Sequence, residues 1–75
     1  MSAGLPALKP ADVIRILERN GFRLLRSTKH RTYVDDANPP HLVTIPYHTR
    51  DLKLKTLRSI IRQTGWTVEE FIQRI

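Results

Sequence analysis

The chain has 75 residues, enough for one small domain, and its 13 Lys and Arg outnumber 7 Asp and Glu to give a net charge of +6. It contains no cysteine, which excludes disulfide frameworks, thiolate zinc sites and cysteine nucleophiles. The basic balance favours a polyanion as partner, and no apolar run approaches the ~20 residues of a membrane helix, so no membrane partner is expected.

The first predicted element is a helix that begins at Pro10 and ends before Gly21. Proline suits the first turn of a helix, because its missing N–H would have no partner there. Asp12 is placed to interact favourably with the positive end of the helix dipole. Gly21 can adopt the left-handed conformation that commonly ends helices, so the helix should stop there.

Three short strands are predicted next, at residues 22–27, 30–35 and 41–46. Apolar and polar residues alternate in them, which is typical of half-buried strands. Turn-forming residues fill the segment 36–40 and separate the second strand from the third. Because the connections are short, the three strands should form an antiparallel meander.

Two helices are predicted after the strands. Residues 47–55 are expected to form a connecting loop, and Thr56 to cap the second helix through its hydroxyl. That helix should end at Gly65. A short third helix should begin at Thr67-Val68-Glu69-Glu70, a pattern typical of a capping box. The two longer helices are expected to cover one face of the sheet and leave the other face open.

The predicted order is therefore helix, three-stranded antiparallel sheet, helix and short C-terminal helix, which is an α+β fold. Residues 10–75 are expected to form a single domain, and residues 1–9 a flexible N-terminal lead. The sequence contains no internal repeat, low-complexity tract or second domain.

The segment between the first two strands combines an imidazole with cations and reads Ser27-Thr28-Lys29-His30-Arg31-Thr32-Tyr33. Cationic side chains can hold a phosphate, and an imidazole, with a pKa of about 6.5 in model peptides, can give or take a proton near neutral pH. His30 is therefore a candidate for proton transfer on a phosphodiester, as base or as acid. The alternative interpretation is a polar residue at the start of a strand.

The neighbours of His30 are candidates for contact with RNA. Lys29 and Arg31 can hold phosphate, or be ordinary solvated charges. Regular alternation would place both on the sheet face opposite His30, although a turn at Thr28-Lys29 can return Lys29 to its side. Tyr33 can stack on a base, or be a packing residue within its strand.

A second basic group lies in the predicted loop and at the second helix. His48 is another imidazole that can contact phosphate, or an exposed loop residue. Lys53, Lys55 and Arg58 lie at the start of the second helix, where free amides also favour phosphate. The alternative is a solvated basic face that a partner protein's acidic residues balance. Three His residues without close spacing make a poor zinc site, so neither metal nor cofactor is expected.

These motifs, taken in order, resemble the HicA family of bacterial toxins. The matching segments span Pro10 to Ile75 and are Asp12-Val13-Ile14, Leu17-Glu18, Asn20-Gly21-Phe22, His30, Tyr33, Val43-Thr44-Ile45-Pro46, His48, Leu54 to Gly65 and Thr67-Val68-Glu69-Glu70-Phe71. Each segment is short, and the resemblance lies in their shared order and spacing. Two positions differ: Thr28-Lys29 replaces the usual Gly-Ser before the catalytic His, and Lys55 replaces a Gly found in many members.

The resemblance implies a double-stranded-RNA-binding-domain-like fold. It implies the toxin of a type II toxin–antitoxin system, an endoribonuclease that cleaves messenger RNA and inhibits translation in the cytoplasm. It makes His30 the catalytic residue and implies a HicB-like antitoxin that covers it, with oligomers only through that antitoxin. The scheme requires no metal, because RNA carries its own nucleophile in the 2′-hydroxyl.

Two alternatives from other functional classes stay open at this point. The first is a non-catalytic RNA-binding module of the same fold, which would recognise helix shape through phosphates and 2′-hydroxyls without cutting. The second is a protein-interaction domain whose open sheet face pairs with another chain. A nuclease should cut single-stranded messages, whereas a binder should protect double-stranded RNA and tolerate the loss of His30.

Overall fold

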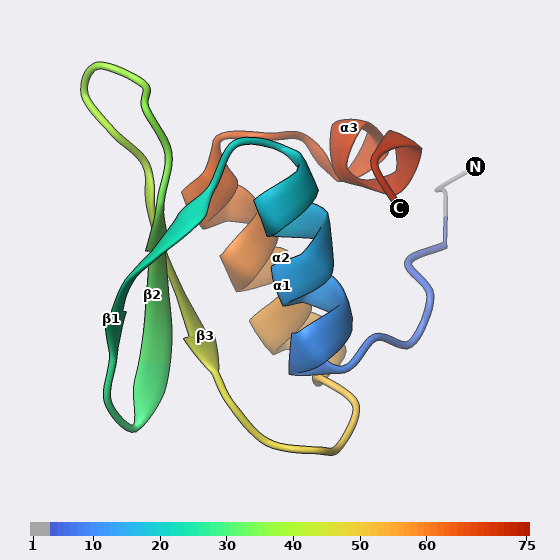
Figure 1. The fold of residues 1–75 in the computed structure, drawn as a ribbon. Coiled ribbons are helices and arrows are strands. Elements are labelled where there is room, and N and C mark those ends of the chain that lie inside the picture. Colours follow the sequence, from blue (N-terminus) through green and yellow to red (C-terminus); the bar gives the residue numbers. More distant parts are fainter. Residues whose placement is uncertain (1–3) are drawn as a thin grey trace.

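The computed structural model describes residues 4–75 of the chain (Figure 1). The elements follow one another as α1 (Pro10–Arg19), β1 (Arg23–Ser27), β2 (His30–Val34), β3 (Leu42–Pro46), α2 (Leu54–Thr64) and α3 (Val68–Gln73). Figure 1 shows α1 and α2 on the same side of the sheet, with α3 beyond them. This order confirms the predicted α+β fold of the double-stranded-RNA-binding-domain type.

The sheet is an antiparallel meander with the strand order β1-β2-β3. Sequence alone predicts a half-buried β1, and this prediction is wrong, because all five residues of β1 are exposed. β1 is an edge strand whose pairing with β2 is irregular between Leu24 and Arg26, and α2 packs against β3 at the other edge. An edge strand with a bulge twists away from the helices and keeps its side chains in water.

The core lies between the sheet and the helices. Val43 and Ile45 of β3 are fully buried and alternate with the exposed Leu42 and Thr44, so β3 has one face on the core. Tyr33 lies directly across from Val43 and is only 2% exposed. The possible role of Tyr33 as a base-stacking residue is therefore wrong, since its ring faces the helices.

The start of α2 differs from the prediction. Thr56 does not cap this helix, which begins at Leu54 with Lys53 as its N-cap residue, three residues before the predicted cap. The cause is tertiary: Leu52 is buried, and its N–H donates to the carbonyl of Leu8 at 2.7 Å. This contact anchors the chain just before Lys53, so the first turn can form without a side-chain cap.

The predicted N-terminal lead, residues 1–9, includes Leu8, whose carbonyl accepts the hydrogen bond from Leu52. Leu8 is buried in the core cluster, and Leu5 packs against that cluster. Residues 1–3 lie outside the described residues. Leu5 and Leu8, which precede α1, are therefore part of the core packing.

Three helix ends agree with their sequence signals. The Asp12 carboxylate accepts a hydrogen bond from the Lys9 N–H at 2.9 Å at the start of α1. At the start of α3, Thr67 and Glu70 form the predicted capping box, with bonds of 3.1 and 2.8 Å. Gly65 ends α2 in the left-handed conformation, at φ 83°.

The loop between β2 and β3 is held by Asp35. The Asp35 carboxylate accepts hydrogen bonds from the N–H groups of Ala37 (3.2 Å) and His41 (2.8 Å), and lies 2.7 Å from His41 Nδ1. Burial opposes ionisation of this carboxyl, but the hydrogen bonds from His41 and Ala37 and the charge of the imidazole outweigh it and lower the pKa of Asp35. The carboxylate form is therefore the one that holds the loop.

Replacing Asp35 with Asn is expected to reduce stability by about 1 kcal/mol at neutral pH, because the bonds to a charged acceptor are lost. The folded-state pKa is depressed, so this contribution is complete above the ordinary pKa of Asp and fades as pH falls through the lowered value. Thermal unfolding of wild type and Asp35→Asn across that acid range measures the effect. A Tm difference that stays constant at every pH would contradict the assignment.

Candidate functional site

His30 begins β2 at the end of the β1–β2 hairpin, directly across from Pro46 of β3. Its side chain is exposed, so the ring is accessible to a large ligand. Thr28 and Lys29 form the turn before it, and the Thr28 N–H donates to the His30 carbonyl at 2.9 Å. Neither turn residue has a positive φ, so this turn closes without glycine.

The two cations beside His30 have different surroundings. Lys29 is exposed at the tip of the hairpin. Arg31 is half-buried, and its guanidinium carbon lies 3.8 Å from the centre of the Tyr47 ring. Arg31 is thus held in a cation–π contact, which distinguishes it from an ordinary solvated charge.

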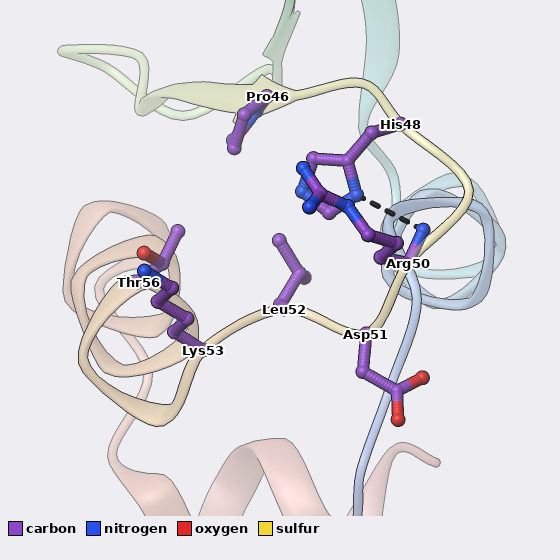
Figure 2. A pocket seen from close by; sticks show the side chains of 7 residues that line it. All are labelled: Pro46, His48, Arg50, Asp51, Leu52, Lys53 and Thr56. Carbon is purple, nitrogen blue, oxygen red and sulfur yellow. Dashed lines mark hydrogen bonds between the residues drawn. The ribbon is translucent and has the colours of Figure 1, made fainter.

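A pocket of about 470 Å³ lies between the end of β3 and the start of α2 (Figure 2). Its lining residues are Pro46, His48, Arg50, Asp51, Leu52, Lys53 and Thr56. The polar lining includes the cations Arg50 and Lys53, and its acidic residue, Asp51, is paired with Lys9 at 3.6 Å. An anion is therefore the ligand that best matches this pocket.

The orientation of His48 is fixed by a backbone contact. Its Nδ1 accepts a hydrogen bond from the Arg50 N–H at 3.2 Å, drawn as the dashed line in Figure 2. A nitrogen that accepts a hydrogen bond carries no proton, so the neutral ring bears its proton on Nε2. His48 can therefore donate a hydrogen bond from Nε2 to an acceptor such as a phosphate oxygen.

The first turn of α2 adds backbone donors beside the pocket. Lys53, its N-cap residue, makes no side-chain capping bond, and the first turn contains no acidic residue. By contrast, a carboxylate lies at the start of both α1 and α3. The free amides of the first turn and the helix dipole therefore favour an anion next to Lys53.

The predicted RNA-binding residues lie on more than one surface of the structure. His48 and Lys53 line the same pocket, and Pro46 connects that pocket to His30, which it faces across the sheet. Lys55 and Arg58 are exposed on α2 and do not line it. Helical rotation explains the separation, because residues two and five positions beyond Lys53 point to other sides of a helix with 3.6 residues per turn.

Arg58 belongs to a different surface. Together with Arg62 it lines a shallow depression beside Trp66, between α2 and the start of α3. The α2 cations therefore form a basic stripe that leads away from the pocket.

Two residues of this region were absent from the sequence-based candidates. Arg50 lines the pocket, and Tyr47 carries the Arg31 guanidinium on its ring. The available signal was their position on either side of His48, in the segment predicted as a connecting loop. Only the tertiary structure places them beside the end of the sheet.

Within residues 4–75, no group of three or more His, Cys, Asp and Glu side chains is arranged to hold a metal ion. No helix in this part of the chain is long and apolar enough to cross a membrane.

Comparison with models of known protein families identifies a match. The sequence model of a family described as "HicA toxin of bacterial toxin-antitoxin" matches residues 10–66, which is well over half of the 75-residue chain. The matched segment contains all the candidate site residues, from Lys29 to Arg58, and ends before α3. No curated protein matches the chain.

Proposed function

The chain belongs to the HicA family of bacterial toxin–antitoxin toxins, and from this membership we propose that it is an endoribonuclease that cleaves messenger RNA and inhibits translation. The observation that carries the proposal is the exposed imidazole of His30, which lies beside cations at the end of the sheet. An accessible proton-transfer group beside phosphate-binding charges is what RNA cleavage requires.

The proposed reaction uses the substrate's own hydroxyl. The 2′-oxygen loses its proton and attacks the adjacent phosphorus, the bond to the 5′-oxygen breaks, and that oxygen takes up a proton. The products are a 2′,3′-cyclic phosphate and a 5′-hydroxyl. His30 performs one of the two proton transfers, and Lys29 stabilises the charge on the phosphate oxygens. Arg31, which follows His30 in β2 and lies over the Tyr47 ring, would contact an adjoining part of the RNA. The scheme involves no metal, so cleavage is expected to continue in EDTA.

The pocket provides a second point of contact with the RNA. His48 and Lys53, with Arg50 and the free amides of α2, would hold a backbone phosphate near the scissile one. Lys55 and Arg58 would contact a more distant part of the backbone along α2. Contacts of this kind orient the strand, whereas the imidazole performs the chemistry.

Membership of the family supports a partner and a location for this chain. A HicB-like antitoxin would cover His30 and the basic pocket, and its acidic residues would compensate the +6 charge of this chain. Any oligomer would form through that antitoxin. The toxin would act in the cytoplasm, where messenger RNA is translated, and residues 10–75 would serve as one domain.

Incubation of the purified protein with a single-stranded transcript and with a duplex tests the activity. The nuclease is expected to fragment the single strand. Protection of the duplex together with an intact single strand would instead support the non-catalytic RNA-binding module.

Replacing both Lys53 and Lys55 with Ala is expected to weaken RNA binding and to reduce its salt dependence. Each lost phosphate contact lowers the slope of log K against log salt concentration by about 0.7 for a single strand. Arg15→Ala together with Arg19→Ala is the matched control, because it removes two positive charges from the exposed face of α1. Titration of labelled RNA at several salt concentrations measures the slope. If the slope stays at the wild-type value, these lysines do not contact the backbone.

A further inference from the structure

We propose that Tyr47 is a stacking platform for an unpaired base of the RNA substrate. This inference rests on the proposed function and names the substrate that the site accepts: a single strand with a base free to leave the stack. Tyr47 is 48% exposed, whereas Tyr33, the other tyrosine, is buried at 2%.

The other aromatic rings are occupied by packing. Phe22 and Phe71 are buried in the core. Trp66 is half-buried against them, with ring centres 5.7 Å from Phe22 and 6.4 Å from Phe71. Among the described residues, Tyr47 is therefore the exposed aromatic side chain, whereas Trp66 packs on two rings and carries the Arg74 guanidinium 4.6 Å from its ring centre.

The Tyr47 ring is held by one neighbour. The Arg31 guanidinium lies over it at 3.8 Å from the ring centre. This contact covers one face of the ring and restricts its rotation, and the exposure of the residue leaves surface for a second flat group. A ring with a fixed orientation binds a base with less loss of side-chain entropy than a freely rotating one.

The location of this ring connects it to the chemistry. Tyr47 follows Pro46, the cross-strand neighbour of His30, and its partner Arg31 follows His30 itself. Successive residues of a strand point to opposite faces, so the ring and the imidazole flank the end of the sheet. The base on Tyr47 would therefore belong to a nucleotide near the scissile phosphate, while the scissile phosphate itself contacts His30.

The surrounding charge favours RNA over a protein partner as the occupant. The next residue, His48, lines the pocket with Arg50 and Lys53, so a stacked base would have backbone phosphate donors beside it. Aromatic stacking accepts any base, because every base has a π-face. A duplex keeps its bases stacked and paired, so this platform selects single strands.

The test measures binding of an uncut oligonucleotide by the His30→Ala protein. A short single-stranded RNA carries 2-aminopurine at successive positions around a cleavage site, and stacking quenches its fluorescence. Tyr47→Leu keeps the bulk of the side chain without the π-system and is expected to weaken binding by about 5- to 150-fold and to restore the fluorescence at one position. Tyr47→Phe keeps the ring and is expected to bind like the parent protein.

An abasic substitution at the quenched position provides the coupling control. It should weaken binding to the parent protein and have little further effect on Tyr47→Leu, since the same contact is removed twice. Wild-type affinity in Tyr47→Leu, or equal losses in Tyr47→Phe and Tyr47→Leu, would overturn the platform. The platform would also be overturned if Tyr47→Leu lost binding to an acidic protein partner and kept its binding to RNA.

The outcomes separate this inference from the proposed function. If the wild-type protein cuts RNA while Tyr47→Leu binds it normally, the platform fails and the nuclease stands. If the wild-type protein never cuts while Tyr47 still quenches the probe, the nuclease fails and the platform stands.

Discussion

Replacing His30 with Ala is expected to lower the rate of RNA cleavage by about 10²- to 10⁴-fold, the usual contribution of a positioned acid or base. His30 is exposed and lies at the start of its strand, so the substitution should change the free energy of unfolding by less than about 0.5 kcal/mol. Expression of the variant in bacteria should therefore relieve growth arrest without loss of folded protein. Growth curves and total messenger RNA, compared with wild type, measure both effects.

The matched control is another imidazole of the same chain. His41 lies just before β3, at the opposite end of that strand from Pro46, and is bonded to Asp35. His41→Ala should keep cleavage activity at temperatures where it is folded, because its ring is remote from the site. Equal toxicity of wild type and His30→Ala would remove His30 from the mechanism.

Replacing Phe71 with Ala is expected to reduce the free energy of unfolding by about 3–5 kcal/mol, the usual effect of deleting a buried aromatic ring. Phe71 is fully buried and contacts the Trp66 ring from α3. The free energy of unfolding of a native domain is only about 5–15 kcal/mol, so the variant should lose a large part of its stability. The prediction is notable because α3 lies outside the segment 10–66 that the family model matches.

Urea unfolding of wild type and Phe71→Ala measures this effect. Ile72→Ala is the control in the same helix, because Ile72 is only half-buried and its truncation should be milder. A loss below about 1 kcal/mol for Phe71→Ala would mean that the packing of α3 contributes little to the domain.

The helix ends and strands could be predicted largely from local chemistry. The start of α1 at Pro10, the stop at Gly65 and the box of Thr67 with Glu70 each depend on residues close in sequence. Thr56 shows where such signals fail. Its hydroxyl is a good cap in isolation, but the contact of Leu52 with Leu8, residues far apart in the chain, starts the helix earlier.

The candidate site was less predictable, because it depends on register and rotation. Alternation alone allowed Tyr33 to face a ligand, and only the pairing of Tyr33 with Val43 places it on the core face. Likewise, Lys53 and Lys55 are close in sequence, yet only Lys53 lines the pocket. Tyr47 was missed because its partner Arg31 is far from it in sequence and lies in β2, so no local pattern indicates their contact.

The most direct measurement is the analysis of RNA ends after incubation of a single-stranded transcript with the purified protein in EDTA. The account predicts fragments that carry a 2′,3′-cyclic phosphate and a 5′-hydroxyl, with no such fragments from His30→Ala. Transcripts that stay intact, or fragments that carry a 3′-hydroxyl and a 5′-phosphate, would contradict it.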